Sequence, residues 1–216
     1  MIAISTSQKE ALIAVEIQGK KKLLSMDSSC KHSENLLFNI DKMLDELGLS
    51  IKDNDSFAVI IGPGSFTGIR IGIALIKGFC SGIDKPVVPI YSFELLACAF
   101  KKSNPSSDFY CAINGLSGMY FVQKFNKDAL SILEPQICTL QELNDLDTPI
   151  VSYAEEQISD ITVTPTPEDL LMLAKQKQAE GKMISAKNLT PFYMRKSQAE
   201  ADLDAKKTAK KISKKI

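Results

Sequence analysis

The residues with the clearest chemical potential form a glycine-rich turn before a long apolar segment. Gly62, Gly64, Ser65 and Thr67 stand where such a turn would direct free backbone N–H groups at an anion above a helix N-terminus. No Gly-Lys-Ser/Thr follows, as a Walker loop requires, and Gly68 comes one position too late for G-x-G-x-x-G. Two interpretations stay open: the turn binds a phosphate, or it sets backbone geometry and helix packing.

Nucleophilic and metal-assisted catalysis find little support in the residue types. Ser65 lacks the G-x-S-x-G elbow, and His32 is the one histidine of the chain. A catalytic triad or a two-histidine zinc site therefore lacks its imidazoles, and His32 is interpreted as a side chain beside a helix cap. We expect no catalytic residue and no metal ligand in this chain.

The cysteines suggest no redox or metal chemistry either. They are odd in number, widely spaced and without a C-x-x-C pair, which is typical of buried or incidental thiols: Cys30, Cys80, Cys98, Cys111 and Cys138.

Two elements would position the glycine turn. The apolar, partly β-branched run at residues 57–61 predicts a buried strand, and Ser65 or Thr67 can cap a helix over residues 66–82. This helix has only a narrow polar stripe, so it should be buried on more than one side.

One flank of that helix is predicted to meet another helix. Gly68, Gly72, Leu75 and Phe79 lie on the same side at 100° per residue, and the glycines would allow a close approach. The second helix could belong to this chain or to another protein, so these residues are candidates for a partner-binding surface.

A second amphipathic helix is predicted over residues 34–47, with Ser33 as its cap and Gly48 as its stop. Its apolar stripe should face the core and consists of Leu36, Leu37, Ile40, Met43, Leu44 and Leu47. Phe38 falls on the opposite face, near Asp41 and Asp45. It is either a single exposed aromatic or an anchor for a partner.

The remaining segments predict an α/β protein with two halves of the order β-β-β-α-β. In the first half the other strands are expected at residues 1–5, 11–17, 22–26 and 87–90, followed by a helix at 92–101 and a linker at 103–108. In the second half, strands are expected at 109–114, 119–125, 129–133 and 149–152, helices at 140–146 and 168–179, an irregular tract at 153–167, and an ordered segment at 189–195. The division is 1–103, 104–204 and a basic tail, 205–216.

Composition indicates a globular chain. Of 216 residues 44% are hydrophobic, no run reaches the roughly 20 apolar residues of a membrane span, and no signal peptide is recognised. The expected location is the cytoplasm, without membrane contact. The net charge is zero, but the charges are unevenly distributed, because residues 205–216 hold six lysines and no acid. That tail is interpreted as a solvated end, a tRNA phosphate contact or a membrane contact.

The sequence GPGSFTGIRIG at residues 62–72 resembles the signature of the bacterial TsaB (YeaZ) family. MIAISTS at 1–7, HSENLL at 32–37 and LTPFYMRKSQAE at 189–200 agree with it. The resemblance implies a duplicated actin/Hsp70/sugar-kinase-like (ASKHA) fold. It also implies a non-catalytic subunit of the complex that forms N6-threonylcarbamoyladenosine on ANN-decoding tRNAs.

In that family the partners are a TsaD-like catalytic subunit, which pairs with the two helices of the first half, and a TsaE-like ATPase. The resemblance thus implies ATP and metal in the partner subunits and no cofactor in this chain. Contact with tRNA is expected through the complex. A homodimer in isolation through the same helix face is a further possibility.

The superfold normally carries an acidic residue in the first hairpin of each half, and this chain has neither. Ser5 and Asn114 occupy those places, and a magnesium site prefers charged oxygens. Both also depart from the TsaB pattern, in which acids stand at these positions. The alternative of an ATPase or small-molecule phosphotransferase is therefore weakened but stays open.

Overall fold

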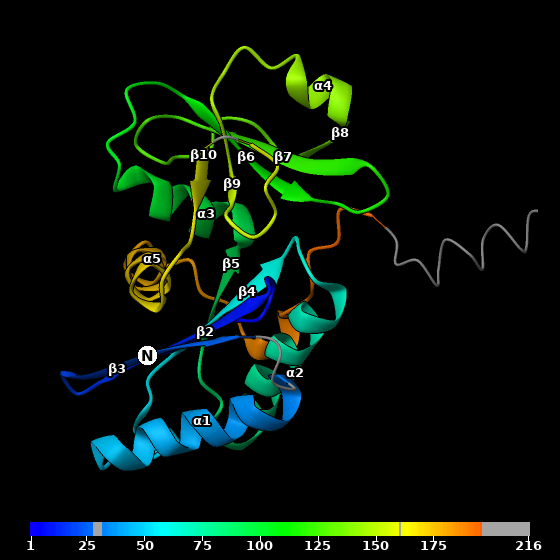
Figure 1. Ribbon diagram of the computed structural model, residues 1–216. Coiled ribbons are helices and arrows are strands. Elements are labelled where there is room, and N and C mark those ends of the chain that lie inside the picture. Colours follow the sequence, from blue (N-terminus) through cyan, green and yellow to red (C-terminus); the bar gives the residue numbers. More distant parts are fainter. Residues whose placement is uncertain (28–31, 160, 196–216) are drawn as a thin grey trace, which may run out of the picture.

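The computed structural model describes residues 1–27, 32–159 and 161–195, which form two five-stranded sheets with helices around and between them (Figure 1). The first sheet has the order β3-β2-β1-β4-β5, with strands β1 (Ile2–Ser5), β2 (Glu10–Ile17), β3 (Lys20–Asp27), β4 (Phe57–Gly62) and β5 (Val87–Tyr91). β1, β2 and β3 pair antiparallel, whereas β1, β4 and β5 run parallel.

The second sheet repeats this arrangement. Its order is β10-β9-β6-β7-β8, with strands β6 (Phe109–Asn114), β7 (Met119–Phe125), β8 (Gln136–Thr139), β9 (Ile150–Tyr153) and β10 (Ile161–Val163). Three antiparallel strands again come first, and the later strands join in parallel on the other side of the first one. The predicted duplication of β-β-β-α-β halves is confirmed.

The helices cover both sheets, and two of them lie between the sheets. They are α1 (His32–Leu47), α2 (Phe66–Ile83), α3 (Ser92–Lys101), α4 (Leu140–Asn144) and α5 (Pro167–Ala179), with short 3-10 turns at Ile51–Asp53 and Ala186–Asn188. α1 and α2 pack on one face of the first sheet, and α5 packs on its other face. α3 contributes Leu95 to the core under α5 and Phe93 and Leu96 to the core of the second sheet.

Most predicted elements are present, with four corrections. The strand expected at residues 129–133 is wrong: that stretch is a loop with a single bridge from Ser131 to Phe125, and the third strand of the second sheet is β8. The tract at 153–167 holds a further strand, β10. The helix expected at 140–146 ends at Asn144.

The fourth correction concerns α1, because Leu37 does not face the core. Its side chain is 50% exposed and lies beside Phe38, which is 64% exposed, while Leu36 and Ile40 are buried. The wide apolar stripe therefore divides into a buried part and an exposed part. The side chains of His32 and Ser33, on which the predicted cap and the role of His32 depend, lie outside the described part of the structure. Cys30 and the basic tail lie outside it as well.

Candidate functional site

A groove of about 1210 Å³ opens between the two halves at the end of the sheets where the glycine turn lies. Its walls come from five segments: the turn after β1 (Thr6 to Lys9), the glycine turn and start of α2 (Pro63 to Ile71), the β6–β7 turn with Phe121, the pair Glu155 and Glu156, and the segment from Phe192 to Arg195. This groove, with walls from both halves, is our candidate functional site.

The glycine turn is held tightly against the turn after β1. The Ser65 N–H donates to the Ser7 carbonyl at 2.8 Å, and a Cβ at Gly64, whose φ is +148°, would collide with that same carbonyl. Ser65 is the N-cap of α2, accepting from the Gly68 N–H at 3.2 Å, which confirms one of the two predicted caps. Anion binding by Gly62, Gly64, Ser65 and Thr67 stays a prediction, although three of the N–H groups here already have protein partners: Ser65, Gly68 and Ile69.

The interpretation of Gly68 and Gly72 as an approach surface for a second helix is wrong. Both are buried, and their missing side chains make room for the first sheet of this chain. A Cβ at Gly68 would collide with the Thr6 carbonyl, and one at Gly72 would lie 2.6 Å from Thr6 Oγ1. The Thr6 hydroxyl uses this closeness to donate to the Gly68 carbonyl at 2.7 Å. These glycines set the distance between α2 and the sheet.

The other predicted partner-binding residues separate into two groups. Leu75 and Phe79 are half-buried beside the first core, and Phe79 stacks on Phe57 with ring centroids 5.6 Å apart. Phe38, Asp41 and Asp45 are exposed on α1. Only the α1 residues thus point wholly away from the chain's own core.

The two places expected to carry acids hold neutral groups with protein partners. Ser5 is buried, and its hydroxyl lies 3.5 Å from the Ser7 hydroxyl, which in turn accepts from the Ser92 hydroxyl at 3.3 Å. In the second half the Asn114 side-chain oxygen accepts from the Leu116 N–H at 2.8 Å and so shapes its own turn. Both side chains support the walls of the groove.

Glu156 is a groove residue that the sequence analysis missed. Its carboxylate accepts from the Asn114 N–H at 2.9 Å, and burial, together with the nearby Glu155 charge, raises its pKa to about 7. A signal for it existed, because the pair directly follows the parallel strand β9, and ligands of parallel α/β sheets bind beyond the carboxyl ends of strands. The position of the pair after a parallel strand was missed because residues 153–167 were interpreted as an irregular tract.

The C-terminal described segment links both halves across the groove. The Phe192 N–H donates to the Ile61 carbonyl at 2.8 Å, and its ring meets Tyr91 edge-on at 4.8 Å. Arg195 then donates to the Leu116 carbonyl at 3.2 Å, on the second half. Figure 1 shows this orange segment passing beside α2 toward the β6–β7 turn.

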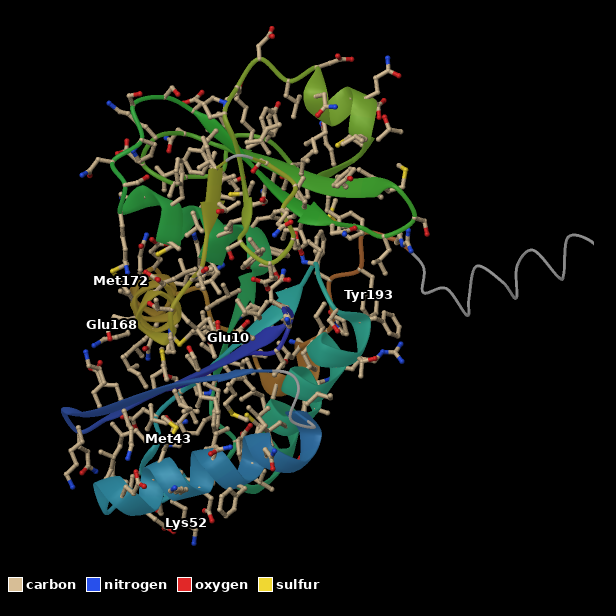
Figure 2. All side chains as sticks on the ribbon, viewed as in Figure 1. Glu10, Met43, Lys52, Glu168, Met172 and Tyr193 are labelled. Atoms are coloured by element: carbon tan, nitrogen blue, oxygen red, sulfur yellow. The ribbon has the colours of Figure 1, made fainter. Side chains whose placement is uncertain are left out.

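Between those two anchor points Tyr193 forms a cluster with α2. Its ring stacks on Phe66 at 4.6 Å, and its hydroxyl accepts from Arg70 Nε at 2.8 Å. The Arg70 guanidinium lies 3.9 Å from the Phe66 ring centre. We call Phe66, Arg70 and Tyr193 the Arg70 cluster; Figure 2 shows Tyr193 beside the start of α2.

The described residues contain no cluster of metal ligands and include one helix with the length of a membrane span. No group of three or more His, Cys, Asp or Glu side chains in this part of the chain is placed to hold a metal ion. α2 is long and apolar enough to cross a membrane by length and composition, but one of its faces is packed on β4 and β1.

Two copies of one β-β-β-α-β half around a groove define an ASKHA-type protein, and comparison with known proteins agrees. A solved structure described as an uncharacterized Pseudomonas aeruginosa protein with similarity to peptidase YEAZ superimposes with a TM-score of 0.77, covering 90% of this chain and 98% of that one at 21% identity.

The family model described as TsaD, tRNA N6-adenosine threonylcarbamoyltransferase, matches residues 26–187. The chain is also similar to two curated proteins named tRNA threonylcarbamoyladenosine biosynthesis protein TsaB. The Haemophilus influenzae protein is 26% identical, covering 90% of this chain and 93% of its own length, and the Escherichia coli protein is 24% identical, covering 95% and 99%. The chain belongs to the TsaD family and, within it, to the TsaB (YeaZ) group.

Proposed function

We propose that the chain is the non-catalytic subunit that pairs with a TsaD-like catalytic subunit in forming N6-threonylcarbamoyladenosine on ANN-decoding tRNAs. The names of its relatives support the pathway. Ser5 and Asn114 support the non-catalytic role, because neither offers the charged oxygens that a magnesium–nucleotide site uses. A TsaE-like ATPase completes the proposed complex, ATP and metal belong to the partner subunits, and the setting is the cytoplasm.

The observation that carries the pairing is an exposed apolar pair on α1. Leu37 and Phe38 are neighbours with at least half of each side chain in solvent. α1 lies beside α2 on the same face of the first sheet, so both helices turn their other sides outward. Exposed apolar residues grouped in this way, with a polar rim, are typical of protein–protein interfaces.

α2 also presents small and apolar residues on its outward side. Ala74 and Gly78 are exposed, and Ile71 and Leu75 are half-buried. Small residues on a helix allow a partner helix to approach closely, while the aromatic Phe38 supplies the large contact area expected of an interface anchor. We define the docking face by Leu37, Phe38, Ile71, Ala74 and Gly78, with Asp41 and Asp45 as its acidic rim.

The pairing is tested by capture of the TsaD-type subunit from the same organism. Phe38→Asp and Ala74→Glu place a charge in the docking face without touching the core, and each should lower the affinity at least about tenfold. Met172→Asp is the matched control, because Met172 is a similarly exposed apolar residue (48%) on α5, over the other face of the first sheet (Figure 2). It should bind as the unchanged chain does; undiminished capture by both docking-face variants would contradict the pairing.

The competing function, an ATPase or phosphotransferase, is separated by calorimetry. We expect no tight binding when ATP and magnesium are titrated into the isolated chain. Micromolar binding there would favour the competing function. Light scattering with and without the catalytic subunit then tests homodimerisation: a dimer that uses the docking face should dissociate when the subunit is added.

A further inference from the structure

The Arg70 cluster is a rigid, partly exposed combination of an arginine with two aromatic rings. Arg70 uses Nε for the Tyr193 hydroxyl and one face for the Phe66 ring, and in the described part of the chain it pairs with no carboxylate. Its terminal nitrogens keep the forked N–H donors that bind phosphate oxygens in pairs. An arginine fixed in this way loses little side-chain freedom when it binds an anion.

Tyr193 supplies an aromatic ring beside that donor. It is 38% exposed although three contacts hold it: the stacking on Phe66, the hydrogen bond from Arg70 and the chain anchors on either side. An exposed ring that is held in place is suited to stacking on a nucleobase, because every base has an aromatic face and little ordering is needed on binding.

Further positive charges occur near the cluster. Lys9 and Arg195 line the same groove as Arg70. The same groove also contains Glu155 and Glu156, and Glu156 accepts from the Asn114 N–H of the second half. A polyanion would be attracted by Arg70, Lys9 and Arg195 and repelled by the two carboxylates.

We propose that the Arg70 cluster binds an unpaired nucleotide of the tRNA substrate, with a phosphate on Arg70 and the base against Tyr193. Arginine and aromatic side chains together are the usual means of holding single-stranded nucleic acid, which fits an unpaired loop or end of the tRNA. The inference rests on the proposed function, since that function brings tRNA to the complex. It adds a direct RNA contact on this subunit.

The test is fluorescence anisotropy of the isolated full chain with a labelled, unmodified tRNA transcript at about 50 mM and about 200 mM salt. The unchanged chain should bind with a salt-dependent affinity. Tyr193→Ala should weaken binding about tenfold, and Tyr193→Trp should restore it, because Trp keeps a ring for stacking. Arg70→Gln should weaken binding and lower the slope of log K against log salt by about one.

Lys124→Gln is the matched control. Lys124 also lies over an aromatic ring, 5.6 Å from Tyr110, but Tyr110 belongs to the core under α4, away from the groove. This variant should bind RNA as the unchanged chain does. Thermal melting of every variant checks that Tyr193→Ala remains folded, and Tyr193→Leu, which keeps an apolar contact but no ring, should bind as weakly as Tyr193→Ala.

Three results would overturn the proposal. The first is no RNA binding by the full chain at any salt concentration, and the second is equal binding by Tyr193→Ala and the unchanged chain. The third is equal competition by polyglutamate, which would assign the surface to acidic peptides. The RNA titration contains no catalytic subunit, so its failure is distinct from failure of the capture experiment above.

Discussion

Glu156 has the most unusual environment among the groove residues. Its carboxyl is half-buried in the groove, and the hydrogen bond from the Asn114 N–H does not offset the loss of water. The pKa of about 7 lies above the ordinary value of 4.5, so the folded chain holds a proton that the unfolded chain has released near neutral pH. Folding stability must then fall as the pH rises from about 4.5 through 7.

We predict that Glu156→Gln removes this pH dependence. Glutamine keeps the acceptor for the Asn114 N–H but has no charge to bury, so the variant should exceed the unchanged chain in stability by about 2 kcal/mol more at pH 8 than at pH 5. Urea unfolding at both pH values measures the difference. Glu155→Gln, at the exposed neighbour, should keep most of the pH dependence, because burial raises the Glu156 pKa more than the Glu155 charge does. Parallel pH profiles for the unchanged chain and Glu156→Gln would refute the burial argument.

At this scale the sequence predicts local roles, such as a helix cap, better than it predicts which distant residues a side chain contacts. Ser65 was recognisable as a cap because an N-cap depends on local spacing. Glu156 and Tyr193 were not recognised as groove residues, because they come from a tract and a segment whose positions depend on contacts with β6 and α2, more than 40 residues away in sequence. Long-range packing of this kind leaves no periodic signal in one sequence.

At the scale of the element, α2 has two faces, and helical periodicity alone could not tell which of them packs on the sheet. Both carry glycines, and both are mainly apolar. Gly68 and Gly72 are on the face against Thr6 and Val59, whereas Gly78 has open space where a Cβ would lie. The depth at which the helix sits on β1 and β4 therefore depends on the first two glycines and not on the third.

Alanine substitutions should separate the two faces of α2. Gly72→Ala is expected to destabilise the chain by about 1–3 kcal/mol, since Thr6 must move and its hydrogen bond to the Gly68 carbonyl is disturbed. Gly78→Ala should stabilise it by about 0.5–1 kcal/mol, because alanine is the better helix former at an exposed site. Chemical denaturation measures both; equal effects would contradict the assigned faces.

The order of elements was predictable because each strand and helix has its own local pattern. Strands 57–61 and 109–114 are apolar runs, and α2 and α5 begin at capping residues, Ser65 and Thr166. The missed strand β8 has three of its four residues exposed, so it lacks the apolar alternation that identifies a strand. The loop at 129–133 was more apolar and was mistaken for it.

For the whole molecule, the two halves of the sequence are interlocked in space. α3 belongs to the first half, yet Phe93 and Leu96 are buried in the second sheet's core. α5 belongs to the second half, yet Leu170 and Ala174 are buried on the first sheet. Lys177 on α5 also donates to the Glu94 carboxylate on α3 at 2.5 Å. The predicted domain boundary between residues 103 and 104 therefore stays a prediction that describes the duplication in the sequence.

We predict that residues 1–103 do not fold alone. Without the second half, Phe93 and Leu96 lose their core, and one face of the first sheet loses α5. The fragment should give poorly dispersed amide resonances, whereas the full chain should unfold in one cooperative transition by circular dichroism. A well-folded, monomeric fragment would show that the first sheet needs neither contact.

The position of α5 has a consequence for the order in which the chain is made. Translation delivers the strands of the first sheet early, but the helix that covers one face of that sheet follows more than 75 residues after β5. During synthesis this apolar face stays uncovered until the second sheet and α5 have left the ribosome, a period of several seconds at about 5–20 residues per second. The nascent chain is therefore most exposed to aggregation and to chaperones late in translation, when it is nearly complete.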